Sequence, residues 1–227
     1  MRIDILTVFP NMLKGFLEES MVRRAADMGA VHINVVDLRD FSQDARRTVD
    51  DRPYGGGPGM IMKPEPLFQA IETLKSPETR VILMSPAGKK FDQQAARALT
   101  AHGHLLLVCG HYEGVDERVI EAHVTDELSI GDYVLTNGAL PAAVITDAVV
   151  RLLPGVLGGG DEATADESFT TSLLEYPQYT RPPVFRGMRV PDILQNGNHP
   201  EIAAWCRRRA LDRTTRRRPD LLTQPVV

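Results

Sequence analysis

Clustered cysteines and long apolar runs are both missing from this chain of 227 residues. Only Cys109 and Cys206 are present, far apart in the sequence, which excludes a disulfide-rich secreted fold. We therefore expect two free thiols and a place in the reducing cytoplasm. Apolar runs such as Leu105–Cys109 are far shorter than the ~20 residues of a membrane helix, so no membrane contact is expected. The first residues also lack the pattern of a signal peptide.

Two common site motifs are absent as well. The chain has no G-x-x-x-x-G-K-[ST] phosphate loop and no H-E-x-x-H zinc pair. Hydrophobic residues make up 43% of the chain and charged residues 25%, a balance that excludes a disordered or collagen-like protein. The length fits one large domain or two small ones.

Positive charge is scarce in most of the chain and concentrated near its end. The formal net charge is -4, yet segment 201–220 holds seven arginines against three acidic residues. An acidic body with a basic tail indicates a nucleic-acid partner. A solvated charged helix is the alternative interpretation of the same arginines.

Strand-like and helix-like stretches alternate over the first two thirds of the chain. Strands are predicted at Arg2–Val8, Val31–Val36, Arg80–Met84 and His104–Cys109. Helical spacing predicts helices at Pro10–Gly29, Pro66–Leu74, Asp92–Ala101, Asp116–Ala122 and Pro141–Leu153. Segment 39–63 is expected to be one long loop, and Ser129–Leu135 a strand or a tight loop. The alternation favours an α/β fold, with a mostly parallel sheet and helices on both faces.

The pattern changes after Pro154, where glycine and acidic residues become frequent. We predict an α/β domain at 1–158, a flexible linker or lid at 159–168, and a small helical domain at 169–227. The last part is expected to contain a helix from about His199 to Leu211 and a basic end.

The most informative part of the long loop is Arg46–Met60, where arginines flank a glycine-rich run. Glycines let a polyanion approach backbone N–H groups, and Tyr54 offers a stacking face. Asp50, Arg52 and Tyr54 are therefore candidate substrate-binding residues. A mobile surface loop is the alternative.

Three further stretches, at 84–88, 109–114 and 129–138, sit where strands should end and together are rich in glycine and tyrosine. In open α/β sheets, ligands bind outside the carboxyl ends of the strands. These loops are expected to form a pocket suited to an adenine or ribose that the main chain recognises. Their pattern alone does not identify the ligand.

Four motifs carry a resemblance to a known family: Asp50–Met60, Gly110–Gly114, Ser129–Leu135 and Tyr179–Pro182. Together they resemble the bacterial tRNA (guanine-N1)-methyltransferases, knotted enzymes of the SPOUT class that modify the guanosine 3′ of the anticodon, at position 37. The match runs nearly end to end, from Phe9-Pro10 to Arg217–Leu221.

The resemblance implies S-adenosylmethionine as methyl donor, a trefoil knot around it, and a homodimer with the active site between subunits. It also implies a dependence on Mg²⁺, for which the sequence shows no dedicated ligand cluster. The donor pocket would be formed by Ser85, Pro86, Gly110, Tyr112, Glu113, Ile130, Gly131, Asp132, Tyr133, Val134, Leu135 and Gly138.

The chemistry needs a general base, because N1 of guanine carries a proton that must leave before N1 attacks the methyl group. Family members have an aspartate directly before Ser-Phe. Here Glu167 stands in that register and Asp166 one position earlier, so both are candidates. Arg151 matches the family's catalytic arginine, which would stabilise charge developing at O6. A residue complementing a helix dipole is the alternative for all three.

The basic tail, with Arg216, Arg217 and Arg218, is expected to contact tRNA phosphates. One departure from the family is Asn137-Gly138-Ala139, where Gly-Gly-Glu is common, which affects the local geometry of the donor pocket. A SPOUT enzyme acting on ribosomal RNA and a non-catalytic RNA-binding module remain the competing hypotheses.

Overall fold

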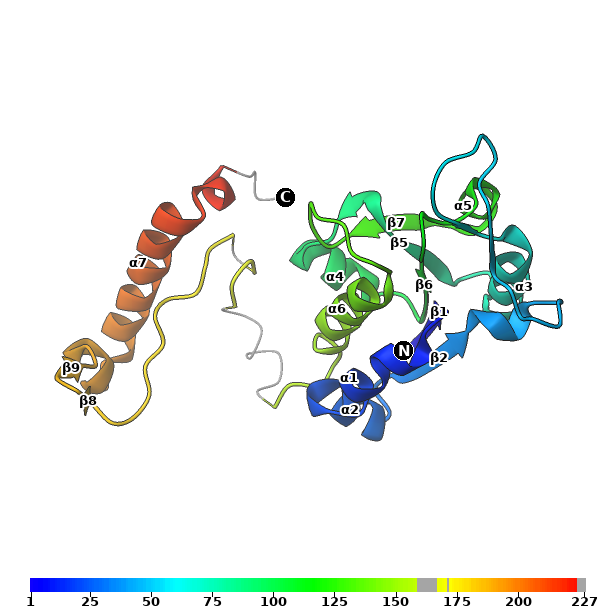
Figure 1. Ribbon diagram of the computed structural model, residues 1–227. Helices are drawn as coiled ribbons and strands as arrows, with labels where there is room; N and C mark the ends of the chain where they lie inside the picture. The colour runs from blue at the N-terminus through cyan, green and yellow to red at the C-terminus, as the bar shows by residue number, and fades with distance from the viewer. Residues whose placement is uncertain (159–166, 171, 224–227) are drawn as a thin grey trace. The chain divides into compact units, whose positions relative to one another are not determined.

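The computed structural model describes residues 1–158, 167–170 and 172–223. The chain divides into two compact units, Met1–Gly158 and Gly159–Val227 (Figure 1).

The first unit is built on a five-stranded sheet in the order β2-β1-β6-β5-β7, with every neighbouring pair parallel. Its strands, from edge to edge, are β2 (His32–Asp37), β1 (Arg2–Thr7), β6 (His104–Cys109), β5 (Arg80–Lys90) and β7 (Asp126–Ser129). The central β6 is buried along its whole length, which explains its unbroken apolar sequence. The expected parallel sheet is therefore confirmed.

Helices cover both faces of this sheet, as expected (Figure 1). One face packs on α1 (Lys14–Leu17), α2 (Ser20–Asp27), α4 (Gln93–Leu99) and α6 (Ala139–Val150). The other packs on α3 (Pro64–Leu74), α5 (Glu117–His123) and the short 3-10 helix Leu38–Phe41. Side chains alternate between the two cores: Leu105 and Leu107 enter the first, and Leu106 and Val108 the second.

Several predicted boundaries are wrong. The helix expected at Pro10–Gly29 is divided into the 3-10 turn Pro10–Leu13, α1 and α2, and the chain turns between α1 and α2 at Ser20, whose φ is +55°. Of the two alternatives for Ser129–Leu135, the loop is confirmed for residues 130–135, whereas Ser129 is the last residue of β7, a strand that was not predicted. β7 is a polar edge strand that lacks the apolar alternation by which strands are recognised.

The segment expected to be one loop, 39–63, contains a short antiparallel pair, β3 (Asp50–Asp51) and β4 (Ile61–Met62). The glycine-rich run therefore closes a hairpin-like loop between paired strands. Each strand has only two residues, too few for a pattern in the sequence.

The amino ends of the strands are closed by a buried polar network. Asp4 is fully buried and lies 2.9 Å from His104 Nε2 and 2.7 Å from Arg2. Thr79 Oγ1 lies 2.7 Å from the other ring nitrogen of His104. The opposite, carboxyl ends of the strands lead into the loops that form the site.

The second unit is organised around α7 (His199–Arg217), which continues past the expected end at Leu211. Segment 174–176 runs along this helix: Leu174 N–H donates to Thr214 Oγ1 over 2.9 Å, and Tyr176 packs edge-on against Trp205. The unit also contains β8 (Val184–Phe185), β9 (Met188–Arg189) and the 3-10 helices Asp192–Gln195 and Pro219–Leu222. Among the residues described in either unit, no helix combines the length and the apolar character needed to cross a membrane.

Candidate active site

A pocket of about 540 Å³ lies at the carboxyl ends of β5, β6 and β7. It is lined by the three glycine-containing stretches singled out from the sequence. One of them, 84–88, was expected to be a loop but lies within β5. Of the twelve predicted donor-binding residues, eleven line it: Ser85, Pro86, Gly110, Tyr112, Glu113, Ile130, Gly131, Tyr133, Val134, Leu135 and Gly138. Asp132 is exposed and is not part of the lining. The structure thus brings together residues from three separate stretches of chain.

The loop 110–114 is held by backbone hydrogen bonds on both sides. Gly138 N–H donates to Gly110 O over 2.8 Å. On the other side, Glu113 N–H donates to Met60 O over 3.0 Å, and Met62 N–H donates to Gly114 O over 2.9 Å. The glycine-rich loop is therefore attached directly to the wall of the pocket.

Two positions near these contacts, Gly138 and Gly59, require glycine. A Cβ on Gly138 would lie 2.7 Å from Cys109 Cα and 3.0 Å from Gly110 N, both backbone atoms that cannot yield easily. A Cβ on Gly59, whose φ is +85°, would lie 2.3 Å from Glu113 Oε1. The glycines therefore allow the loops to approach closely enough to enclose the pocket.

The pocket combines apolar side chains with polar backbone groups. Leu135, Ile130 and Val134 supply apolar surface, and Gly110, Gly131 and Gly138 bring the main chain to the lining. Size and chemistry fit a nucleoside-containing ligand, since such sites are concave, largely apolar, and carry few but well-placed polar groups. S-Adenosylmethionine, with its adenosine and methionine parts, matches this description.

Beside the pocket, Tyr112 lies close enough to Asp50 for the charge of the carboxylate to act on the Tyr112 hydroxyl. Burial, followed by the negative charge of Asp50, raises the pKa of Tyr112, so its hydroxyl stays protonated near pH 7. Asp50 thus lies at the junction between the glycine-rich loop and the pocket. Arg52 and Tyr54 are exposed farther along the loop and do not line the pocket.

His111 also lines the pocket but was not predicted as a site residue. Its Nδ1 is buried and has no hydrogen-bond partner among the described residues. Burial, assisted by the positive charge of Arg39, lowers the pKa of His111, so the ring is neutral near pH 7. A lone histidine in a loop gives no signal in the sequence, because its environment comes from residues far along the chain.

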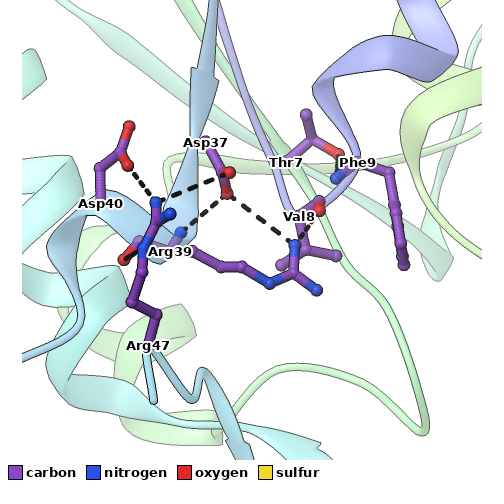
Figure 2. A network of polar contacts seen from close by, with 7 residues as sticks. All are labelled: Thr7, Val8, Phe9, Asp37, Arg39, Asp40 and Arg47. Atoms are coloured by element: carbon purple, nitrogen blue, oxygen red, sulfur yellow. Dashed lines mark hydrogen bonds and ion pairs between the residues drawn. The ribbon is translucent and has the colours of Figure 1, made fainter. Parts of the chain in front are cut away.

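Arg39 connects the carboxyl ends of β1 and β2 by hydrogen bonds to both (Figure 2). Its guanidinium donates to Val8 O, and its backbone N–H donates to the Asp37 carboxylate over 2.9 Å. The guanidinium also lies 5.3 Å from the centre of the Phe9 ring, which in turn packs edge-on against His111 at 5.0 Å.

The same network reaches the glycine-rich loop through Arg47 (Figure 2). Arg47 pairs with Asp40, and its Nη2 lies 3.9 Å from Asp37. The chain just before Asp50 is thereby anchored to the end of the sheet. Neither Arg39 nor Arg47 was predicted to anchor these segments, since their partners lie in other parts of the chain and form no motif in the sequence.

The predicted catalytic residues lie in different parts of the chain. Arg151 is the C-cap residue of α6 and is half-buried. This position is compatible both with a catalytic arginine and with a residue that complements the helix dipole. Glu167 is half-buried in the second unit, where its C=O accepts from Thr170 N–H over 3.1 Å. Asp166 lies outside the described residues.

The three predicted arginines of the tail differ in environment. Arg216 and Arg217 are exposed on the last turn of α7. Arg218 follows the helix, and its guanidinium donates two charge-assisted bonds to Asp220, at 2.9 and 2.6 Å. Arg218 is therefore already engaged within the second unit.

No three histidine, cysteine, aspartate or glutamate side chains come together to hold a metal ion in the described ranges. The two cysteines are both free thiols, as expected, and burial raises the pKa of the Cys109 thiol so that it stays protonated.

Comparison with known proteins assigns this architecture to a family. Residues 1–224 match the model of the family described as tRNA (Guanine-1)-methyltransferase TrmD. The chain belongs to this family. It is 58% identical to the tRNA (guanine-N(1)-)-methyltransferase of Lacticaseibacillus paracasei, over 98% of this chain and 87% of that protein. It is 55% identical to the enzyme of the same name from Geobacillus kaustophilus, over 99% of this chain and 92% of that protein.

Membership of the TrmD family confirms the resemblance noted in the sequence and identifies the chain as a methyltransferase. The relatives are matched across both units, so the second unit is part of the family's architecture and not an unrelated addition.

Proposed function

We propose that this protein transfers a methyl group from S-adenosylmethionine to N1 of the guanosine at position 37 of tRNA, 3′ of the anticodon. One observation carries the proposal: a nucleoside-sized pocket joined to a glycine-rich loop, in a chain that matches the TrmD family over residues 1–224. When bound, S-adenosylmethionine supplies an activated methyl group for in-line displacement.

The donor would be held by residues 85–87 of β5 and by the loops at 110–114 and 130–138, which line the pocket. We further propose that these loops form a trefoil knot. Gly138, at the end of the last loop, packs against Met84 of β5 and Cys109 of β6. A Cβ added to Gly138 would lie 3.0 Å from Met84 Cβ. The tail of β5 also returns to pair with β7 after a shift in register between Met84 and Lys89. This close crossing of loops supports a threaded chain.

The reaction needs removal of the N1 proton, which we assign to the carboxylate of Glu167 or of its neighbour Asp166. The register of the family motif favours Glu167. Arg151 would stabilise the negative charge that develops at O6 as the proton leaves. Asp50, close to Tyr112 beside the pocket, would accept a hydrogen bond from the edge of the target base.

The tRNA would be held by Arg52 and Tyr54 of the exposed loop and by the basic end of α7. Its target base must be unpaired for N1 to be reached, as in an anticodon loop. Because tRNA is the substrate, we expect the enzyme to act in the cytoplasm.

We also propose a homodimer. α6 is apolar on nearly every side, yet Leu140 and Val144 are 55% and 47% exposed on one face of it. Met12, 47% exposed, extends this apolar face, and its sulfur accepts a hydrogen bond from Asn137 of the pocket loop. A second copy covering this face would lie directly beside the pocket.

Methyl transfer from labelled S-adenosylmethionine to unmodified total tRNA and to ribosomal RNA tests the proposal. Label in tRNA alone is expected, whereas label in ribosomal RNA would favour a SPOUT enzyme with a different substrate. Calorimetry with S-adenosylmethionine and no RNA should show binding. Absence of binding heat together with absence of transfer would favour a non-catalytic RNA-binding module.

A further inference from the structure

The β8–β9 hairpin of the second unit exposes apolar side chains to solvent. Phe185 is 55% exposed, Met188 65% and Val184 46%, within an unbroken exposed stretch at 178–189. A two-stranded hairpin is marginally stable by itself, because it lacks a second layer against which to bury a face. Such a surface gains stability when a partner covers it.

The turn of the hairpin fixes how these side chains are presented. Arg186 and Gly187 have φ values of +50° and +79°, as in a tight two-residue turn, and they place Phe185 directly opposite Met188. The Arg186 guanidinium lies 5.3 Å from the centre of the Phe185 ring. The Arg186 guanidinium therefore packs against the Phe185 ring, while more than half of the Phe185 side chain remains accessible to solvent.

The charge around the hairpin has one sign. Three arginines and no acidic residue lie between Tyr176 and Pro191. The surrounding chain, 167–223, has ten arginines against six acidic residues. An exposed aromatic ring among unopposed arginines is the combination that stacks bases and neutralises phosphates.

We propose that the β8–β9 hairpin is an RNA contact, in which Phe185 stacks on an accessible base while Arg186 and Arg189 neutralise neighbouring phosphates. This inference rests on the proposed function, because tRNA is the RNA concerned. The hairpin lies where α7 begins and the basic turn lies where it ends (Figure 1). A helix of 19 residues separates the two by about 28 Å, so together they would contact more of the tRNA than the anticodon loop.

The test measures the affinity of the full-length protein for a labelled tRNA transcript, with guanosine 3′ of the anticodon, at several salt concentrations. Phe185→Ala should weaken binding about tenfold without changing the salt dependence, because a neutral ring releases no counterions. Arg189→Gln should lower the slope of log affinity against log salt by about one. Phe185→Trp should bind as the wild type does, since any aromatic face can stack.

Exposed residues of the first unit provide matched controls, Met28→Ala for the apolar change and Arg24→Gln for the charge change. Unchanged affinity in Phe185→Ala overturns the proposal. A change of oligomeric mass in Phe185→Ala with normal RNA binding also overturns it, because the hairpin would then contact a second copy. Methyl transfer by the wild type is measured in parallel: its absence contradicts the proposed function, whereas the hairpin variants report on RNA binding alone.

Discussion

At the scale of single residues, two adjacent carboxylates compete for the role of general base. Proton removal by a positioned side chain typically contributes ~10²–10⁴-fold to a rate. We expect Glu167→Gln to lower the single-turnover rate by that factor while S-adenosylmethionine and tRNA still bind, and Asp166→Asn to lower it much less. The opposite order would assign the base to Asp166. Near-normal rates in both variants would contradict a general base in this segment.

Single residues are also where sequence reasoning is most uneven. The residues lining the pocket were predictable, because glycine-containing stretches stand where strands were expected to end and the carboxyl ends of parallel strands meet at one edge. His111 and Arg39 were not, since their roles depend on partners far along the chain: Phe9 contacts both of them. Asp132 was included for its motif alone and is exposed.

At the scale of elements, the start of α6 depends on Gly138. We expect Gly138→Ala to weaken S-adenosylmethionine binding more than tenfold, because the added Cβ collides with the backbone of Cys109 and Gly110 and displaces the pocket loop. Gly103→Ala is the matched control, since nothing lies within 4 Å of its added Cβ. Calorimetry measures both affinities. Equal affinities for the two variants would contradict the close crossing of loops as the basis of the pocket.

The end of α7 gives a second prediction at this scale. Arg216→Gln and Arg217→Gln together should weaken tRNA binding and flatten its salt dependence by about two units of slope, because each exposed arginine neutralises one phosphate. Arg218→Gln should leave the slope almost unchanged, because its guanidinium is engaged by Asp220. Filter binding at several salt concentrations measures the slopes. Equal effects of all three substitutions would show that the Asp220 pair opens when tRNA binds.

Strands and helices with a clear apolar pattern in the sequence were predicted well, and those without such a pattern were not. The central strands were recognised from apolar runs that only a sheet covered on both faces can bury. β7 escaped notice because it is short, polar and at the sheet edge, where its Asp126 pairs with Arg80. The break between α1 and α2 at Ser20 could not be predicted either, since the apolar residues keep their helical spacing across it while the backbone turns.

At the scale of the whole molecule, the exposed face of α6 predicts that two chains associate. We expect light scattering to give twice the mass of one chain, and Leu140→Asp with Val144→Asp to give a single-chain mass, because charges would be buried in the interface. Met28→Asp, at a 49% exposed position outside this face, should remain a dimer. A wild-type protein with the mass of one chain would contradict the proposed homodimer.

Methyl transfer to N1 of one guanosine is tested most directly by mapping the methylated nucleoside in the product. Two unmodified tRNA transcripts that differ only at position 37, guanosine in one and adenosine in the other, are incubated with S-adenosylmethionine and analysed by nucleoside mass spectrometry. We expect one 1-methylguanosine, at position 37, in the first transcript and no methylation of the second. Methylation at another position or atom, or equal methylation of both transcripts, would contradict the proposed function.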